Sequence, residues 1–131
     1  MYTFAVRTGS HTQFVNIDRD VQRAVDESGI ESGVAHVFVP HTTAGVTINE
    51  NADPNVVRDL EAILERMAPW NNGYTHDEGN SAAHAKASLM GFCQTVLIEN
   101  GRLALGTWQS LYFAEFDGPR NRSVWVQVIG A

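Results

Sequence analysis

Hydrophobic and polar residues alternate with two different periods along the chain, and together these periods predict a mixed α+β fold. Residues 123–129 alternate apolar and polar side chains, which is the period of a half-buried strand. Over residues 54–67, apolar side chains recur every three or four positions, which is the period of an amphipathic helix. Asp53 precedes this helix as an N-cap, and Pro54 occupies the first helical position, where its missing N–H costs nothing.

The remaining elements follow from shorter patterns and from turn residues. Asn-Gly at 100–101 suits a tight type I′ turn, which predicts a hairpin, and another hairpin is predicted around the turn at 8–12. Asp18 is expected to cap a helix that Gly29 ends. The predicted strands are 2–7, 13–17, 33–39, 46–50, 95–99, 102–105, 108–116 and 123–129, and the shorter helices are 18–28 and 82–90.

The grouping of these strands indicates the fold class. Strands that come in groups with short connections favour an antiparallel α+β fold over a parallel α/β fold. The chain has 131 residues, which is the length of one ordinary domain. We therefore expect a single compact α+β domain over residues 1–131, with mainly antiparallel β-sheet layers and two to three helices. Charged residues make up 18%, below the usual fraction of about a quarter, which weakly indicates surface hidden in an oligomer.

Composition argues against several classes of function. The net charge is −6 and Lys86 is the only lysine, so binding to nucleic acid is not expected. No apolar stretch reaches the roughly 18 residues that span a membrane, and the N-terminus lacks the pattern of a signal peptide. Cys93 is the single cysteine, which excludes an intrachain disulfide and fits a cytoplasmic location. It is interpreted as a small apolar filler, because no cation or helix N-terminus adjoins it in sequence.

The segment PHTTAGVTINENADP, residues 40–54, places many polar side chains between a buried strand and the clearest helix. Two well-formed elements hold such side chains in fixed positions, which is typical of a functional site. The alternative interpretation is a strand, a turn and a helix cap. The pattern of this segment alone leaves both interpretations open.

Three of the five histidines lie in positions that suit a site. His41 ends a strand, His76 is in a polar loop, and His84 is on the helix that follows. Catalytic zinc takes three imidazoles and a water, so these residues are candidate ligands of a divalent metal. Their spacing allows convergence but does not require it. His11 lies in a turn and His36 within an apolar strand, and neither position indicates chemistry.

Charged residues near the C-terminus form a second candidate group. Glu115 lies in an otherwise apolar strand, where an unpaired carboxylate is costly, so it is expected to pair with a cation or to face solvent. Arg120 and Arg122 are near in sequence and would supply either that partner or a phosphate-binding fork. No Gly-x-Ser-x-Gly or Gly-x-Gly-x-x-Gly pattern occurs, which argues against a serine hydrolase and a nucleotide-binding loop.

Three segments, HTTAGVTINENADP, AHAKASLMG and NGRLALGTWQSLYFAEFDGPRNR, resemble the YjbQ family. The likeness covers nearly the whole chain in order, from the early strands to VWVQVIG near its end. It implies a compact α+β domain that assembles as a homotrimer. Some members are credited with a secondary thiamine phosphate synthase activity, which joins hydroxymethylpyrimidine diphosphate to a thiazole phosphate and releases pyrophosphate.

The resemblance also implies a site made from several segments. His41, His76 and His84 match the family's histidine pattern, so a divalent metal is expected there, zinc-like because of the imidazole ligands, with magnesium as the alternative. Asp53 or Glu115 would orient a histidine or act as a base. The residues expected to bind substrate are Thr42, Asn49, Gln109 and Arg120, and Asn51 also matches the family pattern.

Two functions follow from these residues. The first is an enzyme acting on a small phosphorylated molecule, whose histidines hold a divalent metal or contact phosphate. The second is a non-catalytic, trimeric module that binds a metabolite or a metal. Purely structural roles for every polar residue form a third interpretation, which leaves the resemblance at those positions unexplained.

Overall fold

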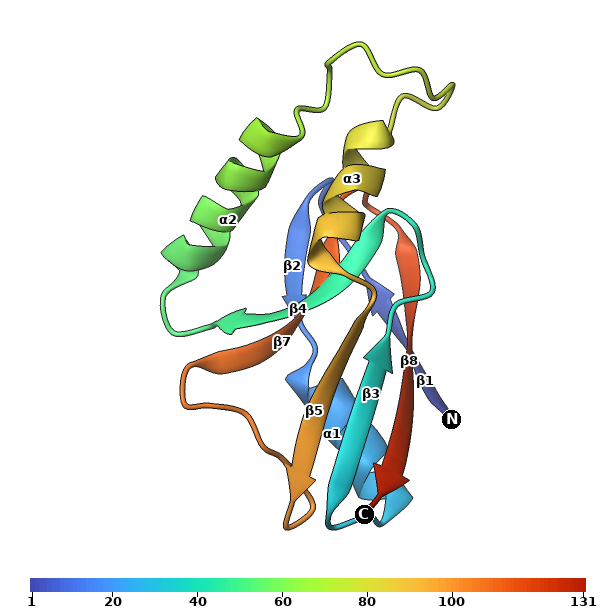
Figure 1. The fold of residues 1–131 in the computed structure, drawn as a ribbon, viewed down its shortest axis with the longest axis vertical. Coiled ribbons are helices and arrows are strands. Elements are labelled where there is room, and N and C mark those ends of the chain that lie inside the picture. The colour runs from blue at the N-terminus through green and yellow to red at the C-terminus, as the bar shows by residue number, and fades with distance from the viewer.

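Two β-sheets and three helices make up the computed structural model, which describes all of residues 1–131 (Figure 1). The mixed α+β class predicted from the sequence is confirmed. In chain order the elements are β1 (Tyr2–Arg7), β2 (Gln13–Asn16), α1 (Asp18–Ser28), β3 (Gly33–Phe38), β4 (Ala44–Glu50), α2 (Pro54–Met67), α3 (Ser81–Met90), β5 (Cys93–Glu99), β6 (Arg102–Leu103), β7 (Gln109–Glu115) and β8 (Asn121–Gly130).

The strands form a five-stranded sheet in the order β1-β8-β3-β5-β6 and a three-stranded sheet in the order β2-β7-β4. Every pairing is antiparallel, as the sequence predicts. In the smaller sheet, Glu115 of β7 lies opposite both Gln13 of β2 and Ala44 of β4. The end of β7 therefore adjoins the start of β4, and Figure 1 places the start of β8 at this same end of the molecule.

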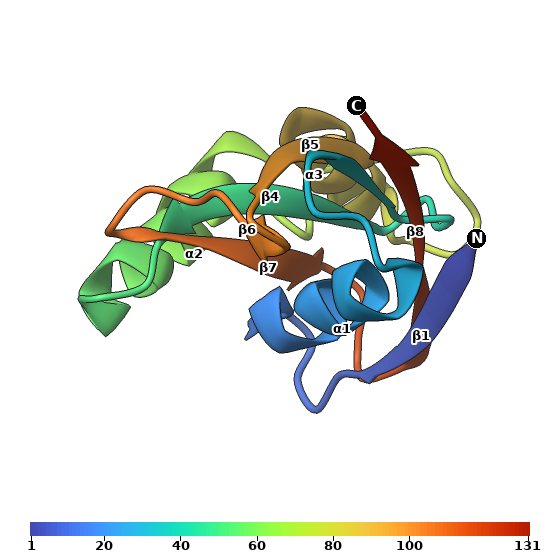
Figure 2. The same ribbon diagram turned by 90° about the horizontal axis from the view of Figure 1, so that it is seen from below.

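Both sheets and α1 share one apolar core. α1 lies beside the two sheets in Figure 2, and its residues Val21 and Val25 are buried. Val124 and Val126 of β8 and Phe113 of β7 belong to the same buried cluster. The alternation predicted for β8 is thus confirmed, since successive strand side chains point to opposite faces of a sheet.

The outer face of the five-stranded sheet is open and carries large apolar side chains. In Figure 1 the lower parts of β3, β5 and β8 have no helix in front of them. Large side chains are exposed on these strands, and the rings of Phe38 and Trp125 stack with centroids 5.7 Å apart. Leu97 and Ile129 are exposed on the neighbouring strands. An apolar patch of this kind is typical of a surface that another protein chain covers.

The long connection between β4 and β5 carries two helices, which pack against the sheets to different extents. α3 packs on the smaller sheet through Ala83 and Ala87, which cluster with Phe116. α2 stands beside the sheets in Figure 1, and Leu64 is its only buried residue. Its apolar stripe is therefore largely uncovered within the chain, with Ile63 and Met67 exposed.

Capping of α2 follows the prediction, whereas capping of α1 does not. The Asp53 side chain accepts a hydrogen bond from the Asn55 N–H at 2.9 Å. Asp18 lies inside the first turn of α1, and its carboxylate accepts from the Leu111 N–H of β7 at 2.7 Å. The side chain predicted to cap α1 instead ties that helix to the smaller sheet.

Two further predictions from the sequence are wrong. The hairpin predicted around residues 8–12 does not form, because β1 pairs with β8 and β2 pairs with β7, in different sheets. Cys93 does not act as a small apolar filler, since it is exposed at the start of β5. The hairpin predicted at residues 100–101 is confirmed by pairing of Ile98 with Leu103.

Replacing Gly45 by alanine is expected to cost about 1–3 kcal/mol of unfolding free energy, because overpacking forces the neighbouring backbone to move. A Cβ atom at this position would lie 2.5 Å from the Gly91 carbonyl oxygen and 3.0 Å from the Met90 Cβ, at the end of α3. Gly9→Ala is the matched control, since the nearest side-chain atom there is 4.0 Å away. Urea denaturation measures both variants, and equal stability of the two would contradict the close approach of α3 to β4.

Candidate functional site

The site residues predicted from the sequence fall into three groups in the structure. One group lies where the β3–β4 connection meets the start of β8, the second lies at the beginning of α3, and the third lies at the far end of the smaller sheet. We call these groups the β8 corner (His41, Thr42, Glu115, Arg120 and Arg122), the histidine pair (His76 and His84) and the sheet end (Asn49, Asn51, Asp53 and Gln109).

A buried ion pair forms the base of the β8 corner. Glu115 is 0% exposed and Arg122 is 6% exposed. The Arg122 guanidinium donates through Nε to Glu115 Oε1 at 2.8 Å and through Nη2 to Glu115 Oε2, which is the two-pronged geometry that suits a carboxylate. Glu115 thus has the cationic partner that its position in an apolar strand requires, and Arg122 is that partner.

Further donors complete the shell around Glu115. The Thr8 hydroxyl donates to Oε1 at 2.9 Å and the Asp117 N–H donates to Oε2 at 3.1 Å. Burial alone raises the pKa of the Glu115 carboxyl, but the Arg122 guanidinium and these donors outweigh it and leave the pKa below its ordinary value. The carboxylate is therefore charged, enclosed and fully bonded, which suits it to holding Arg122 rather than to taking a proton from a substrate.

His41 is anchored to the first residues of β8. Its Nε2 accepts a hydrogen bond from the Ser123 N–H at 2.9 Å. The pairing of β3 with β8 ends at Phe38 opposite Trp125, so this N–H lies beyond the last strand pair and the imidazole satisfies it. Burial, followed by the positive charge of Arg122, lowers the pKa of the His41 imidazole. Thr42, the next residue, is exposed to solvent.

Arg120 joins the β8 corner to the start of α3. Its Nε donates to the Asp117 carbonyl at 2.7 Å, and its Nη2 lies 3.2 Å from the Asp117 carboxylate. The same carboxylate accepts from Asn80 Nδ2 at 2.9 Å, immediately before α3. Arg120 is half-exposed, so it is tied at one edge while the rest of its guanidinium faces solvent.

The structure brings His76 and His84 together. Their ring centroids are 5.5 Å apart and the rings are nearly perpendicular. His76 comes from the loop before α3 and His84 from its second turn, so the eight-residue spacing does converge. His76 Nε2 also lies 4.0 Å from Glu78. Two imidazoles this close are suited to forming part of a metal site or to donating to one anion.

His41 does not join this pair in a metal centre within one chain. No group of three or more His, Cys, Asp or Glu side chains is arranged to hold a metal ion. The Nε2 lone pair of His41, moreover, is occupied by the Ser123 N–H. Within the chain, His76 and His84 therefore form a pair and not a three-ligand centre.

The sheet end lies far from the β8 corner. Asn49 and Ala44 are five residues apart on β4, a separation of roughly 17 Å at about 3.4 Å per residue. At this end the Asn49 side chain accepts from the Glu50 N–H at 2.7 Å, and Gln109 Oε1 accepts from the Gly106 N–H at 2.8 Å. Asn51 donates to Ser110, and the Asp53 carboxylate caps α2. These side chains and the β8 corner cannot contact one small ligand within a single chain.

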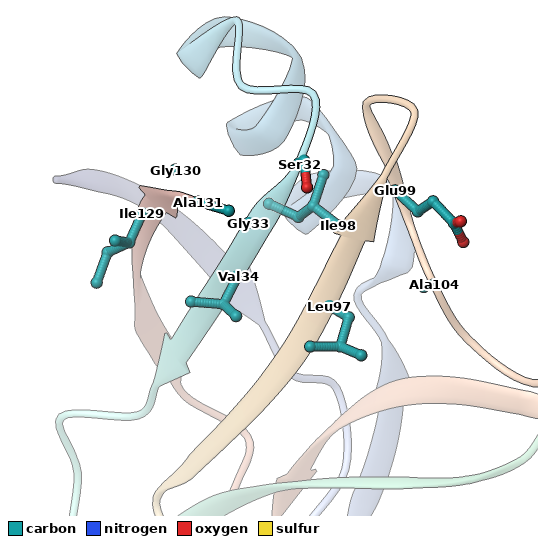
Figure 3. Close-up of a pocket in the computed structure, with 10 residues that line it drawn as sticks. All are labelled: Ser32, Gly33, Val34, Leu97, Ile98, Glu99, Ala104, Ile129, Gly130 and Ala131. Carbon is teal, nitrogen blue, oxygen red and sulfur yellow. The ribbon is translucent and has the colours of Figure 1, made fainter.

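The main clefts in the chain are lined by other residues. An apolar hollow of about 560 Å³ is lined by Val34, Leu97 and Ile129 at the far end of the five-stranded sheet (Figure 3). A larger cleft of about 730 Å³, lined mainly by polar and charged residues, includes Trp70 and Lys86. Neither contains a residue that the sequence assigned to a site.

Two buried polar residues near the site were not predicted from the sequence. Lys86, the only lysine, is 4% exposed and donates to Glu65 at 2.9 Å. Asn80 is buried, and its Oδ1 is the only fully buried side-chain nitrogen or oxygen without a hydrogen-bond partner. The period of α3 gave no warning of either burial, because this helix is nearly uniform in hydrophobicity around its axis.

Comparison with known families and proteins agrees with the resemblance seen in the sequence. A family model described as "UPF0047 protein YjbQ-like" matches residues 2–131. The UPF0047 protein YugU of Bacillus subtilis is 47% identical over 129 residues, which cover 98% of both chains. The UPF0047 protein MJ1081 of Methanocaldococcus jannaschii is also 47% identical, over 99% of this chain and 94% of that protein.

Solved structures resemble the fold just as closely. A conserved YjbQ/UPF0047 protein from Clostridium acetobutylicum superposes with a TM-score of 0.96 at 55% identity, covering 98% of this chain and 100% of that one. The protein TT1486 from Thermus thermophilus gives a TM-score of 0.91 at 44% identity, covering 98% and 100%. The names of these relatives state no activity, so they support the fold and the family but no reaction.

Proposed function

Because the chain belongs to the YjbQ-like UPF0047 family, we propose that it is an enzyme acting on small phosphorylated molecules, with a reaction like that of thiamine phosphate synthase. In that reaction hydroxymethylpyrimidine diphosphate loses pyrophosphate and joins the nitrogen of a thiazole phosphate. The observation that carries the proposal is the convergence of His76 and His84 beside a corner that holds Arg120 and Arg122.

The proposed chemistry needs positioning and charge stabilisation more than a base. Loss of pyrophosphate leaves a stabilised cation and a strongly anionic leaving group, so preorganised cationic and N–H donors lower the barrier. His76 and His84 would contact the pyrophosphate or hold a divalent metal, zinc-like or magnesium, which would neutralise part of its charge. Arg120 has guanidinium surface facing solvent for the same purpose.

We further propose that the active site is shared between subunits of a homotrimer. The sheet end is roughly 17 Å from the β8 corner along β4, so Asn49 and Gln109 would bind substrate only at a neighbouring subunit's corner. The uncovered stripe of α2 and the apolar outer sheet face offer surfaces for such an assembly. A head-to-tail contact that closes after three copies forms a ring of identical sites.

Steady-state turnover of hydroxymethylpyrimidine diphosphate and thiazole phosphate tests the proposal. His76→Ala and His84→Ala are each expected to lower kcat by about 100-fold or more, as expected for loss of a charge-stabilising group. Arg23→Ala is the control, since Arg23 is an exposed residue of α1, outside the three groups and both proposed assembly surfaces, and it is expected to leave kcat unchanged. Full turnover in both variants would contradict the assignment of His76 and His84 to the active site.

One observation favours the alternative of a non-catalytic, trimeric binding module. Both carboxylates proposed as a base are already occupied, Glu115 by Arg122 and Asp53 by the α2 cap. A module would bind the phosphorylated molecule or a metal at the same residues without turnover. Calorimetric binding of the substrates together with no product in the turnover assay would favour the module over the enzyme.

A further inference from the structure

We propose that His41 and Arg122 together form a phosphate-binding subsite at the β8 corner, separate from the histidine pair. The subsite uses the Nδ1–H of His41 and the Nη1 amino group of Arg122. It rests on the proposed function only for the source of the phosphate, which is the phosphorylated substrate. Its structural basis is the hydrogen bonding of the two side chains.

The backbone of β8 fixes the tautomer of His41. An N–H can donate only to an unprotonated ring nitrogen, so the Ser123 N–H at 2.9 Å requires a lone pair on Nε2. The neutral imidazole then carries its hydrogen on Nδ1. Nδ1 has no partner in the chain and is not among the fully buried unpartnered atoms, so it reaches solvent as a donor.

Arg122 is held in place with one amino group free. Nε and Nη2 donate to Glu115, and Nη2 also donates to the Thr43 hydroxyl at 2.8 Å. These bonds leave Nη1 without a partner in the chain. Because Asn80 Oδ1 is the only fully buried side-chain atom without a partner, Nη1 also reaches solvent. Arg122, whose side chain is 6% exposed, is therefore held by its other nitrogens while Nη1 stays free to donate.

Chain connectivity places the two donors at the same corner. Arg122 bonds Thr43, two residues after His41, while Ser123, the residue after Arg122, bonds His41 itself. The positive charge of Arg122 also acts on the His41 imidazole. One neutral donor and one charged donor, both immobilised before binding, suit a phosphate oxygen, because little side-chain freedom is lost on contact.

The two fixed donors favour a ligand with several accepting oxygens. Glu115 already offsets the Arg122 charge, so the corner would hold an anion through directed hydrogen bonds rather than through net charge. Phosphate, with nearly two charges and three accepting oxygens, gains more from two fixed donors than a single carboxylate does. Arg120 is not part of this subsite, because its guanidinium is bonded to the Asp117 carboxylate.

The test measures binding of inorganic phosphate to His41→Gln. Glutamine places an amide oxygen where Nε2 lies and so keeps an acceptor for Ser123, but it lacks a donor at the Nδ1 position. The dissociation constant is expected to rise by about 10- to 100-fold, as for loss of a hydrogen bond to a charged group. Arg23→Gln is the control, because it removes an exposed cation of α1 that lies outside the corner, and it is expected to bind phosphate like the unaltered chain. Equal affinity in His41→Gln would overturn the subsite.

A local measurement covers the case in which substitution disturbs the fold. In the unaltered chain, long-range ¹H–¹⁵N correlation spectra are expected to show His41 protonated at Nδ1 alone. Added phosphate is expected to shift that Nδ1 resonance and an Arg122 side-chain resonance. An Nε2–H tautomer, or phosphate shifts at His76 and His84 with none at His41, would overturn the subsite.

Failure of the subsite and failure of the proposed function give different results. Phosphate that shifts His41 in a chain without turnover leaves the subsite standing and removes the enzyme. Full turnover and unchanged phosphate affinity in His41→Gln remove the subsite and leave the enzyme standing.

Discussion

Replacing Glu115 by alanine is expected to lower the free energy of unfolding by about 3–5 kcal/mol, the usual cost of removing one partner of a buried ion pair. The variant leaves the Arg122 guanidinium, 6% exposed, without a counter-charge. It also leaves the Asp117 N–H without its acceptor and removes one of the two acceptors of the Thr8 hydroxyl, the other being the Arg120 carbonyl at 3.1 Å. Urea denaturation measures the loss.

Two controls separate the effect of breaking the ion pair from the effect of removing a carboxylate. Glu78→Ala removes a carboxylate that is 70% exposed, and it is expected to change stability by less than about 0.5 kcal/mol. The double variant Glu115→Leu with Arg122→Met removes both charges and is expected to recover most of the loss, since apolar pairs often replace buried ion pairs without cost. A loss below about 1 kcal/mol in Glu115→Ala would contradict the buried network.

Local structure was predictable where short-range chemistry decides it. Asp53 and Pro54 predict the start of α2, and Asn100 with Gly101 predicts the β5–β6 turn. Both features depend on backbone geometry that a few adjacent residues determine. The apolar alternation of β8 likewise predicts its buried face.

Features that depend on distant partners were not predictable. Tyr2–Arg7 and Gln13–Asn16 look like two arms of a hairpin, but each pairs with a C-terminal strand about a hundred residues away in sequence. Asp18 suits a helix cap, yet its carboxylate bonds the Leu111 N–H instead. In each case a tertiary partner competes with the local one and wins.

The candidate site was likewise predictable only where local sequence determines it. The spacing of His76 and His84 allows the two side chains to converge but does not require it, because one lies in a loop and the other on a helix. The structure brings them together. The cationic partner of Glu115 was narrowed to two arginines, and packing selects Arg122. Nothing in the sequence pattern indicates that His41 satisfies a β8 backbone N–H, because that contact spans 82 residues.

Mixing two inactive variants is expected to restore activity if the site is shared between subunits. His84→Ala damages the histidine pair, and Gln109→Ala damages the sheet end on the same chain. In a mixed ring of three, each interface joins the histidine pair of one subunit to the sheet end of the next. An equal mixture would have both halves intact at about a quarter of interfaces, and would reach about a quarter of the unaltered rate.

Subunit mixing is therefore the most direct measurement of the shared site. The two variants are unfolded and refolded together at equal concentration, with the unaltered chain treated identically as the reference for recovery. We expect each variant alone to be nearly inactive and the mixture to recover about a quarter of the reference turnover. A mixture no more active than either variant, beside a fully recovered reference, would place the working residues within one chain and contradict the shared site.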